Sequence, residues 1–247
     1  MNSTYLKLIA LMGLVTLILL SISGCAGTMQ AIEHREMSLS AKMSDTIFLD
    51  PETLMKNRNI FVRVTNTSDF QEIDFGEVMK GKLAAKGYSI TNNPSQAGYI
   101  IQANLLYLGE EKKGLTADGM LAGGFGGALA GSAMGGDWKG SVAGGLAGAV
   151  IGSVVGGVVG SMIHVDTYLG AIDVQVKEIV EGGVTGTMQT DAKQGSATYL
   201  TTQRDVKSSH QEYRTRIVVQ ATQTNINRQE ACKCITDRLA TQIAGMF

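Results

Sequence analysis

The sequence predicts an α+β fold, in which an antiparallel sheet with two packed helices is interrupted by a glycine-zipper transmembrane α-helical hairpin. Alternating apolar and polar residues indicate strands both before and after the middle of the chain. One segment in each half carries apolar residues at helical spacing, which indicates a helix with one buried face. Between these halves, residues 119–160 hold 16 of the 31 glycines. The two halves of the α+β domain are therefore expected at residues 47–110 and 165–247, on either side of a hairpin at residues 111–164.

The N-terminus predicts export. One charged residue, Lys7, precedes an apolar run over residues 8–20, which is 13 residues long. Such a run is too short to span a membrane comfortably but suits the core of a signal peptide. Shortly after the run comes Ile-Ser-Gly-Cys at residues 22–25, which resembles the bacterial lipoprotein box. An ordinary secretory signal and an uncleaved anchor are the alternatives.

The resemblance to the lipoprotein box implies that residues 1–24 are a signal peptide and that the thiol of Cys25 is acylated. Cys25 would then be the first residue of the mature chain. Each buried methylene of an acyl chain contributes about 0.8 kcal/mol, so several chains on one residue anchor durably. Ala26 follows, where lipoproteins retained in the inner membrane typically have Asp. The resemblance therefore implies an outer-membrane protein, with residues 25–46 as a lipidated tether and short helix.

The first half of the domain is expected to contain strands and one helix. Residues 60–65 alternate in polarity and predict a strand. Residues 71–86 place their large apolar residues on one helical face, and Gly87 is expected to stop this helix. A short strand at 88–91, a turn at 92–94 and a strand at 99–107 follow.

The second half is expected to continue the same sheet. Residues 172–177 alternate apolar with polar, which predicts a strand with its apolar side inward. Further elements are a glycine turn at 182–183, a polar strand at 184–190, a loop over 191–209, a strand at 213–221 and a helix at 227–246.

Two cysteines remain once Cys25 is assigned to lipid. Cys232 and Cys234 are two positions apart on the predicted C-terminal helix, so their side chains point about 200° apart and do not face each other. A zinc site needs four ligands, and no His or second Cys pair lies nearby in the sequence. We therefore expect Cys232 to face the core and Cys234 to be more exposed.

The glycines of the central segment are regularly spaced. At about 100° per residue, a step of four turns only about 40° around a helix, so each set would form a groove on one helical face. Flexible linkers are polar and aperiodic, unlike this segment. In a soluble buried hairpin the glycines would cost on the order of 10 kcal/mol relative to alanine. The residues of the predicted membrane helix packing are Gly119, Gly123, Gly127, Gly131, Gly135, Gly140, Gly144, Gly148, Gly152, Gly156 and Gly160.

Close packing between membrane helices would offset the cost of these glycines. Residues 119–136 and 140–163 are free of charges, and their lengths suit a hydrocarbon core of about 30 Å. Asp137, Trp138 and Lys139 separate them and are expected to form the hairpin turn, with Trp138 at the interface. Two glycine grooves in each subunit imply a neighbour on both sides, which predicts a ring-like homo-oligomer.

Composition argues against an enzyme and against a nucleic-acid partner. The chain has 21 basic and 22 acidic residues, so no positive excess is available for a phosphate backbone. Three widely separated histidines (His34, His164 and His210) offer little for a metal site, and no phosphate-binding loop or nucleophile elbow occurs. No catalytic residue, metal or cofactor is expected, apart from the covalent lipid on Cys25.

Several motifs together resemble one family, and their order and spacing cover nearly the whole mature chain. They are Met-Ser-Asp-Thr-Ile-Phe-Leu-Asp-Pro (43–51), Val-Arg-Val-Thr-Asn-Thr-Ser-Asp (62–69), Ala-Ala-Lys-Gly-Tyr (84–88), Tyr-Ile-Ile-Gln-Ala-Asn (99–104), Thr-Tyr-Leu-Gly-Ala-Ile-Asp-Val-Gln-Val (167–176) and Tyr-Arg-Thr-Arg-Ile-Val (213–218). With the lipoprotein box, this set resembles the TraT family of complement-resistance and surface-exclusion lipoproteins of conjugative plasmids. The Cys232–Cys234 pair and residues 109–118 depart from the family pattern.

The resemblance implies a surface-exposed oligomer of the outer membrane. Such proteins hinder mating by cells that carry a related plasmid, and some protect against complement, so a donor-cell mating component or complement proteins are the implied partners. A pore or translocation channel is the alternative function, which conductance in bilayers would reveal. A structural envelope lipoprotein is a third possibility, which surface accessibility would separate.

Partner specificity is expected in the polar segment before the glycine-rich region. It is the densest short charge cluster of the chain, and recognition tends to use loops held by a rigid scaffold. Mere solvation of a helix end is the competing explanation. The predicted residues are Glu110, Glu111, Lys112, Lys113, Thr116 and Asp118.

Overall fold

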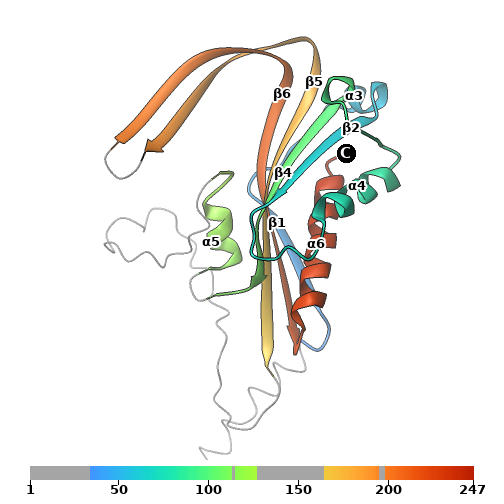
Figure 1. Ribbon diagram of the computed structural model, residues 1–247, viewed down its shortest axis with the longest axis vertical. Coiled ribbons are helices and arrows are strands. Elements are labelled where there is room, and N and C mark those ends of the chain that lie inside the picture. Colours follow the sequence, from blue (N-terminus) through green and yellow to red (C-terminus); the bar gives the residue numbers. More distant parts are fainter. Residues whose placement is uncertain (1–33, 113–114, 127–163, 195–197) are drawn as a thin grey trace, which may run out of the picture.

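The computed structural model describes residues 34–112, 115–126, 164–194 and 198–247, and the side chains of 189–201 are not described. The described residues form a six-stranded sheet in the order β1-β6-β5-β4-β2-β3 (Figure 1). The strands are β1 (Ser38–Met43), β2 (Asn59–Asn66), β3 (Ser89–Thr91), β4 (Tyr99–Glu110), β5 (Val165–Gln194) and β6 (Thr198–Thr224). The helices are α3 (Pro51–Lys56), α4 (Phe75–Ala85), the 3-10 turn η1 (Pro94–Gln96), α5 (Ala117–Ala122) and α6 (Arg228–Ala244).

The sheet is mixed, which corrects the antiparallel sheet expected from the sequence. β2 runs parallel to both β3 and β4, whereas the β4–β5, β5–β6 and β1–β6 pairs are antiparallel. Parallel neighbours need a crossover connection, and α4 supplies one between β2 and β3. Alternation of apolar and polar residues predicts that a segment is a strand. It carries no information on whether the neighbouring strand runs parallel or antiparallel, so the parallel pairing of β2 was not predicted.

The described residues contradict the predicted transmembrane helical hairpin, although residues 127–163 of its segment lie outside them. Within the described residues, no helix has the length and apolar character needed to cross a membrane. In the predicted hairpin segment the described helix is α5, which has six residues and ends at Gly123. Gly124 and Gly126 follow with φ angles of 57° and 71°, in the left-handed region that ends a helix. Gly123, one of the predicted helix-packing glycines, is therefore the C-cap of α5 instead.

Two further expectations fail at the edges of the sheet. The short helix expected within residues 25–46 is replaced, in its described part, by β1, which pairs with β6. The loop expected over 191–209 is instead mostly strand, because β5 continues to Gln194 and β6 begins at Thr198. The segment is polar but rich in Thr, and β-branched residues favour strands even when exposed.

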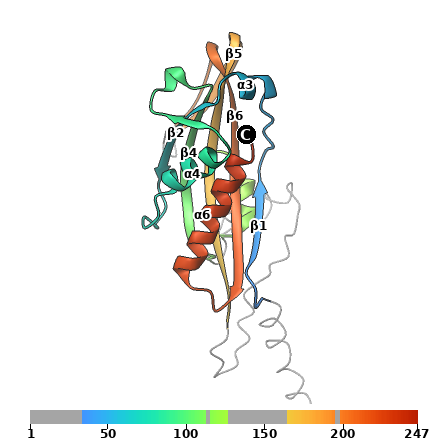
Figure 2. The same cartoon turned by 90° about the vertical axis from the view of Figure 1, so that its right-hand side faces the viewer.

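The predicted packing of two helices on one face of the sheet is confirmed. α4 and α6 lie side by side on that face (Figures 1 and 2). Asp74 and Asn227 cap the N-termini of α4 and α6 by accepting from backbone N–H groups in the first turn, and Gly87 follows α4 at φ 85°. The main core lies between these helices and the sheet, with Ile60, Met79, Ile101, Ile172, Ile217 and Leu239 fully buried.

At Gly170 of β5, side chains of α6 pack directly against the backbone of the sheet. A Cβ at this position would lie 2.3 Å from Ile235 Cγ2 and 3.3 Å from Leu239 Cδ1. We expect Gly170→Ala to lower the free energy of unfolding by about 1–3 kcal/mol, because α6 must shift to admit the methyl group. Gly81→Ala is the matched control: nothing lies within 4 Å of its Cβ, so this change inside α4 should stabilise by about 0.5–1 kcal/mol. Urea denaturation measures both, and an equal midpoint for the two variants would contradict the packing argument.

The two cysteines of α6 occupy the predicted environments. Cys232 is buried and Cys234 is half-buried. Burial raises the pKa of the Cys232 thiol to about 11, and burial also raises the pKa of Cys234. Because the thiolate is the reactive species, we expect a maleimide at pH 8 to label Cys234 at least about 100-fold faster than Cys232.

The labelling experiment uses the chain without its first 33 residues, which removes Cys25. The Cys234→Ser variant should take up almost no label until it is unfolded, whereas the Cys232→Ser variant should react at once. Similar rates in the two folded variants would show that α6 does not bury Cys232.

Candidate functional site

The polar segment predicted to carry specificity lies where β4 ends and α5 begins. Glu110 is the last residue of β4, and the backbone N–H of Glu111 donates to Thr167 O at 2.8 Å. Lys112 forms an isolated β-bridge with Leu115, and its ammonium lies 6.0 Å from the ring centroid of Tyr107. The structure therefore holds this short segment against the end of the β4–β5 pair.

Two of the predicted residues have structural roles at α5. The side chain of Thr116 caps the helix by accepting from Gly119 N at 3.2 Å. The carboxylate of Asp118 forms an ion pair with Lys42 of β1 at 2.7 Å, and both side chains are more than half exposed. An exposed pair of this kind contributes up to about 1 kcal/mol. Glu110, Glu111 and Lys112 are thus the described residues of the set whose side chains have no such role in fixing α5.

Burial raises the pKa of Glu111 above its ordinary value. Its carboxyl group therefore binds a proton at a higher pH than an ordinary glutamate does. Several of the predicted site residues lie outside the part of the chain that the structure describes. They are Cys25, Lys113 and the residues of the predicted hairpin turn, Asp137, Trp138 and Lys139. Of the glycine stripe, Gly119 lies in α5 and Gly123 caps it, whereas the stripe from Gly127 to Gly160 is outside the described part.

α5 covers the face of the sheet opposite to α4 and α6 (Figure 1). Met120 of α5 is fully buried against Leu169 and Ala171 of β5 and Val218 of β6. These strand residues alternate with Ile172 and Ile217, which belong to the main core on the other face. The sheet is consequently buried on both faces at this level.

A buried ion pair lies directly beside this second core. The guanidinium of Arg216 in β6 is fully buried and binds Asp173 of β5 through two bonds, Nε to Oδ1 at 2.6 Å and Nη2 to Oδ2 at 3.0 Å. Two parallel bonds of this kind fix the relative orientation of the side chains. The pair therefore joins β5 to β6 beside α5.

The same ion pair also forms hydrogen bonds with the backbone before and after the C-terminal end of α5. Arg216 Nη1 donates to Met120 O at 3.0 Å, and Asp173 Oδ2 accepts from Gly126 N at 2.8 Å. Met120 lies within the helix and Gly126 lies after it. One ion pair therefore holds both α5 and the chain that follows it against the sheet.

Sequence reasoning missed this pair. Asp173 was expected on the polar, outward side of a half-buried strand, and it does lie on that face, but α5 and the chain after it cover the face there. The available signal was a pair of opposite charges, Asp173 and Arg216, each set in an apolar stretch of a predicted strand. Among the residues that the structure describes, no group of three or more His, Cys, Asp or Glu side chains is placed to hold a metal ion.

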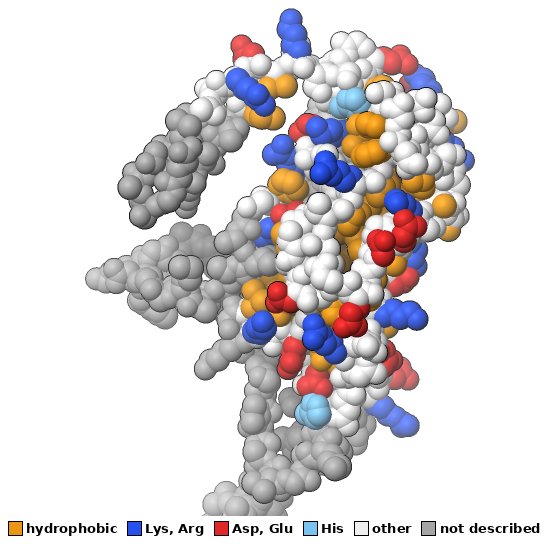
Figure 3. All heavy atoms as spheres, in the orientation of Figure 1, with side chains coloured by type: hydrophobic (Ala, Val, Ile, Leu, Met, Phe, Trp, Pro, Cys, Tyr) orange, Lys and Arg blue, Asp and Glu red, His pale blue; other side chains and the backbone are white. Residues whose placement is uncertain are grey.

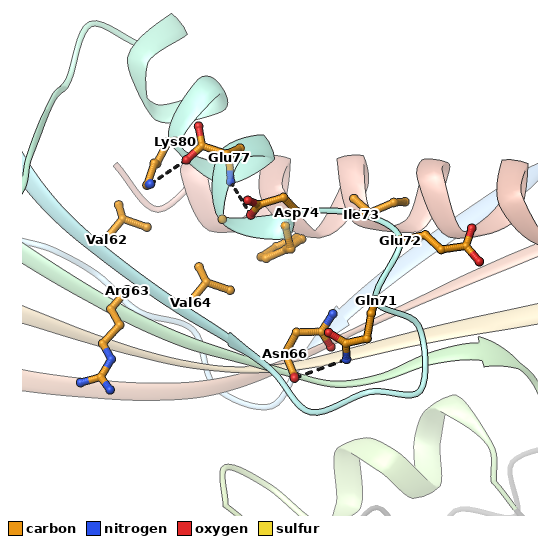
Figure 4. Close-up of a pocket in the computed structure, with 12 residues that line it drawn as sticks. Val62, Arg63, Val64, Asn66, Gln71, Glu72, Ile73, Asp74, Glu77 and Lys80 are labelled. Carbon is orange, nitrogen blue, oxygen red and sulfur yellow. Dashed lines mark hydrogen bonds and ion pairs between the residues drawn. The ribbon is translucent and has the colours of Figure 1, made fainter.

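A hollow of about 650 Å³ lies on the other face, between β2 and the start of α4 (Figure 4). Val62 and Val64 point into it from β2, whereas Arg63 points away. Ile73 and Phe75 add apolar surface, and Glu72, Asp74 and Glu77 line it as an acidic rim. The ammonium of Lys80 is held by Glu77 at 2.7 Å.

Comparison with known proteins identifies the family. The model of the family described as "Enterobacterial TraT complement resistance protein" matches residues 36–247. A TraT complement resistance protein of Escherichia coli is 32% identical over 98% of this chain and 98% of its own length. A second, from Escherichia coli strain K12, is 31% identical over 92% of this chain and 93% of its own length. One from Wigglesworthia glossinidia brevipalpis is 29% identical over 40% of each chain. These matches confirm the resemblance seen in the sequence motifs, and the chain belongs to the TraT complement resistance protein family.

Proposed function

We propose that this protein is a lipid-anchored barrier at the surface of the outer membrane, which protects the cell against complement and hinders entry of related conjugative plasmids. Complement resistance is supported by the family match over residues 36–247, the observation that carries the proposal. Surface exclusion and outer-membrane anchoring are supported by the sequence motifs and by the lipoprotein box that ends at Cys25. We also propose that the barrier is a homo-oligomer, since association places many copies of one surface side by side.

The proposal is tested by expressing the full chain in a serum-sensitive, plasmid-free strain. Survival in fresh serum should rise relative to the empty vector, whereas survival in heat-inactivated serum should be equal for both. As recipients, the same cells should accept a related plasmid less often than an unrelated one. Equal serum killing at confirmed surface expression would refute complement resistance, and equal mating frequencies would refute surface exclusion.

Specificity for the donor is expected to depend on residues 110–113. We expect that exchanging these four residues for those of a relative from another exclusion group moves mating inhibition toward that group's donors by at least about tenfold, because a repeated surface segment acts by avidity. Thr116 and Asp118 are kept, since they cap α5 and bind Lys42.

The matched control is Asp118→Asn, which removes the ion pair with Lys42 without touching residues 110–113. It should leave donor preference unchanged. If the exchange leaves donor preference unaltered at normal surface level, specificity lies elsewhere in the chain.

A further inference from the structure

The β5–β6 hairpin extends far beyond the sheet. Residues 184–194 of β5 and 198–208 of β6, here called the arm, pair with each other and with no other described strand. At roughly 3.3 Å per residue each strand of the arm is about 36 Å long. The register shifts between Ile179 and Val184, where Gly182 and Gly183 take φ angles of 86° and 74°, and there the ribbon bends away from the sheet (Figure 1).

An isolated two-stranded ribbon is marginally stable in water, so the arm is expected to have a partner. Its two outer edges carry unpaired backbone groups, and no proline interrupts them. Its described side chains also differ between its two faces. Val184, Met188 and Val206 lie on one face with Arg204, and the cross-strand pairs Val184–Ser208 and Met188–Arg204 place them there. The alternate residues Thr185, Thr187, Gln203 and Asp205 are exposed and polar.

β2 has a partly unpaired edge to which a further strand could be added. β4 covers one side of β2 along its length, but β3 covers the other side only at Asn59, Ile60 and Phe61. Over residues 62–66 no described strand pairs with the outer edge of β2. At its far end the amide of Gln71 lies 3.5 Å from Asn66 O, which closes the vacant stretch (Figure 4). The hollow beside this edge leaves room for the side chains of an added strand.

The hollow and the arm match in chemistry. The floor of the hollow is apolar at Val62 and Val64. Three carboxylates line its rim, those of Glu72, Asp74 and Glu77, together with two cations, Arg63 and Lys80, of which Lys80 pairs with Glu77. On the apolar face of the arm, Val206 lies two residues from the exposed Arg204. A strand laid on the edge of β2 with this face toward α4 would place Val206 on the valines and Arg204 beside the acidic rim. Strand addition of this kind takes affinity from main-chain hydrogen bonds and specificity from alternate side chains.

The arm cannot reach the hollow of its own chain. β4 separates β5 from β2 in the sheet, and the arm arcs over the face that carries α5 (Figure 1). The hollow opens on the opposite face, between β2 and α4. In Figure 3 the described side chains of the arm stand clear of the body, with Lys and Arg among them. An arm that occupies the hollow must therefore come from another molecule.

We propose that the arm of one copy adds as a strand to the free edge of β2, residues 62–66, in the next copy, with Val206 and Arg204 in the hollow beside α4. The contact joins two different surfaces, so it is head-to-tail and each copy both gives an arm and receives one. A ring results if the rotation between copies closes. This inference rests on the self-association proposed above and names the element that carries it.

Paired cysteines test the contact in the full chain, in outer-membrane fractions, on a Cys234→Ser background. Glu72→Cys and Arg204→Cys in one chain should give a ladder of disulfide-linked multimers on mild oxidation. Neither single variant should give a ladder, and neither should Arg204→Cys combined with Lys233→Cys on the exposed face of α6. A dimer from Arg204→Cys alone would show that arms pair with each other, which would overturn the inference.

A second measurement separates the inference from self-association itself. Val206→Asp places a carboxylate on the face that enters the hollow and should weaken association at least about tenfold in detergent, measured as the concentration at which the oligomer dissociates. Gln203→Asp, on the other face of the arm, should not. An oligomer of normal stability in Val206→Asp would refute the role of the arm and leave self-association standing. A wild-type chain that is monomeric at all concentrations would refute both.

Discussion

Replacing Arg216 by methionine should lower the free energy of unfolding by about 3–5 kcal/mol, because the buried carboxylate of Asp173 loses its counter-charge. Asp173 is 7% exposed and would keep the Gly126 N–H as a donor. One backbone donor does not replace a guanidinium that makes two bonds at 2.6 and 3.0 Å. Urea or thermal unfolding measures the loss.

Arg214→Met is the matched control for this effect. Arg214 lies two residues away on the same strand face, its side chain is 47% exposed, and it binds Glu212 at 3.2 Å. Removing it should cost less than about 1 kcal/mol, as for other exposed ion pairs. If the two variants unfold at the same denaturant concentration, the buried pair does not contribute as proposed.

The double variant Arg216→Met with Asp173→Asn tests the cause of the loss. Without a buried charge, the double variant should recover part of the stability that Arg216→Met loses, because the cost comes from the unpaired carboxylate. It should still loosen the end of α5, because a methionine side chain offers no donor to Met120 O. Protease cleavage near residues 123–126 should therefore be faster in the double variant than in the wild type, although both are folded.

Much of the fold follows from local patterns in the sequence. Alternation found the strands at 60–65, 99–107, 172–177 and 213–221, and helical spacing found α4 and α6 together with their common face of the sheet. These signals are short-range, since each reports which side of an element is buried. Burial of Cys232 relative to Cys234 was predictable for the same reason.

The failures concern longer-range relations. The parallel direction of β2 depends on which strands pair with it, and the alternation of apolar and polar residues does not reveal the pairing. The glycine period fitted a helical stripe, but Gly123 of that stripe caps α5. The next glycines, Gly124 and Gly126, take positive φ angles, which glycine adopts without steric cost. Asp173 and Arg216 lie on the predicted face of their strands, yet a six-residue helix covers that face and buries both. The burial of this ion pair is thus caused by α5, which neither strand's own sequence predicts.

Cys25→Ala should abolish stable attachment to the membrane and leave the chain as an unprocessed or mislocalised precursor. The prediction rests on the short apolar run that precedes Ile-Ser-Gly-Cys at residues 22–25. Each acyl methylene contributes about 0.8 kcal/mol, so losing all chains should reduce the stably anchored fraction by well over about 100-fold.

Cys234→Ala is the matched control, because it removes a half-buried thiol of α6 that carries no lipid in this proposal. It should leave the chain in the outer membrane and labelled by radioactive palmitate, whereas Cys25→Ala should take up no label. Intact-mass measurement of the wild-type chain should show an N-terminus at Cys25 with added acyl mass. Normal cleavage at another residue, with no acyl adduct, would replace the lipid anchor by an ordinary secretory signal. Surface protection would then have to arise from a chain held at the membrane by its protein contacts alone.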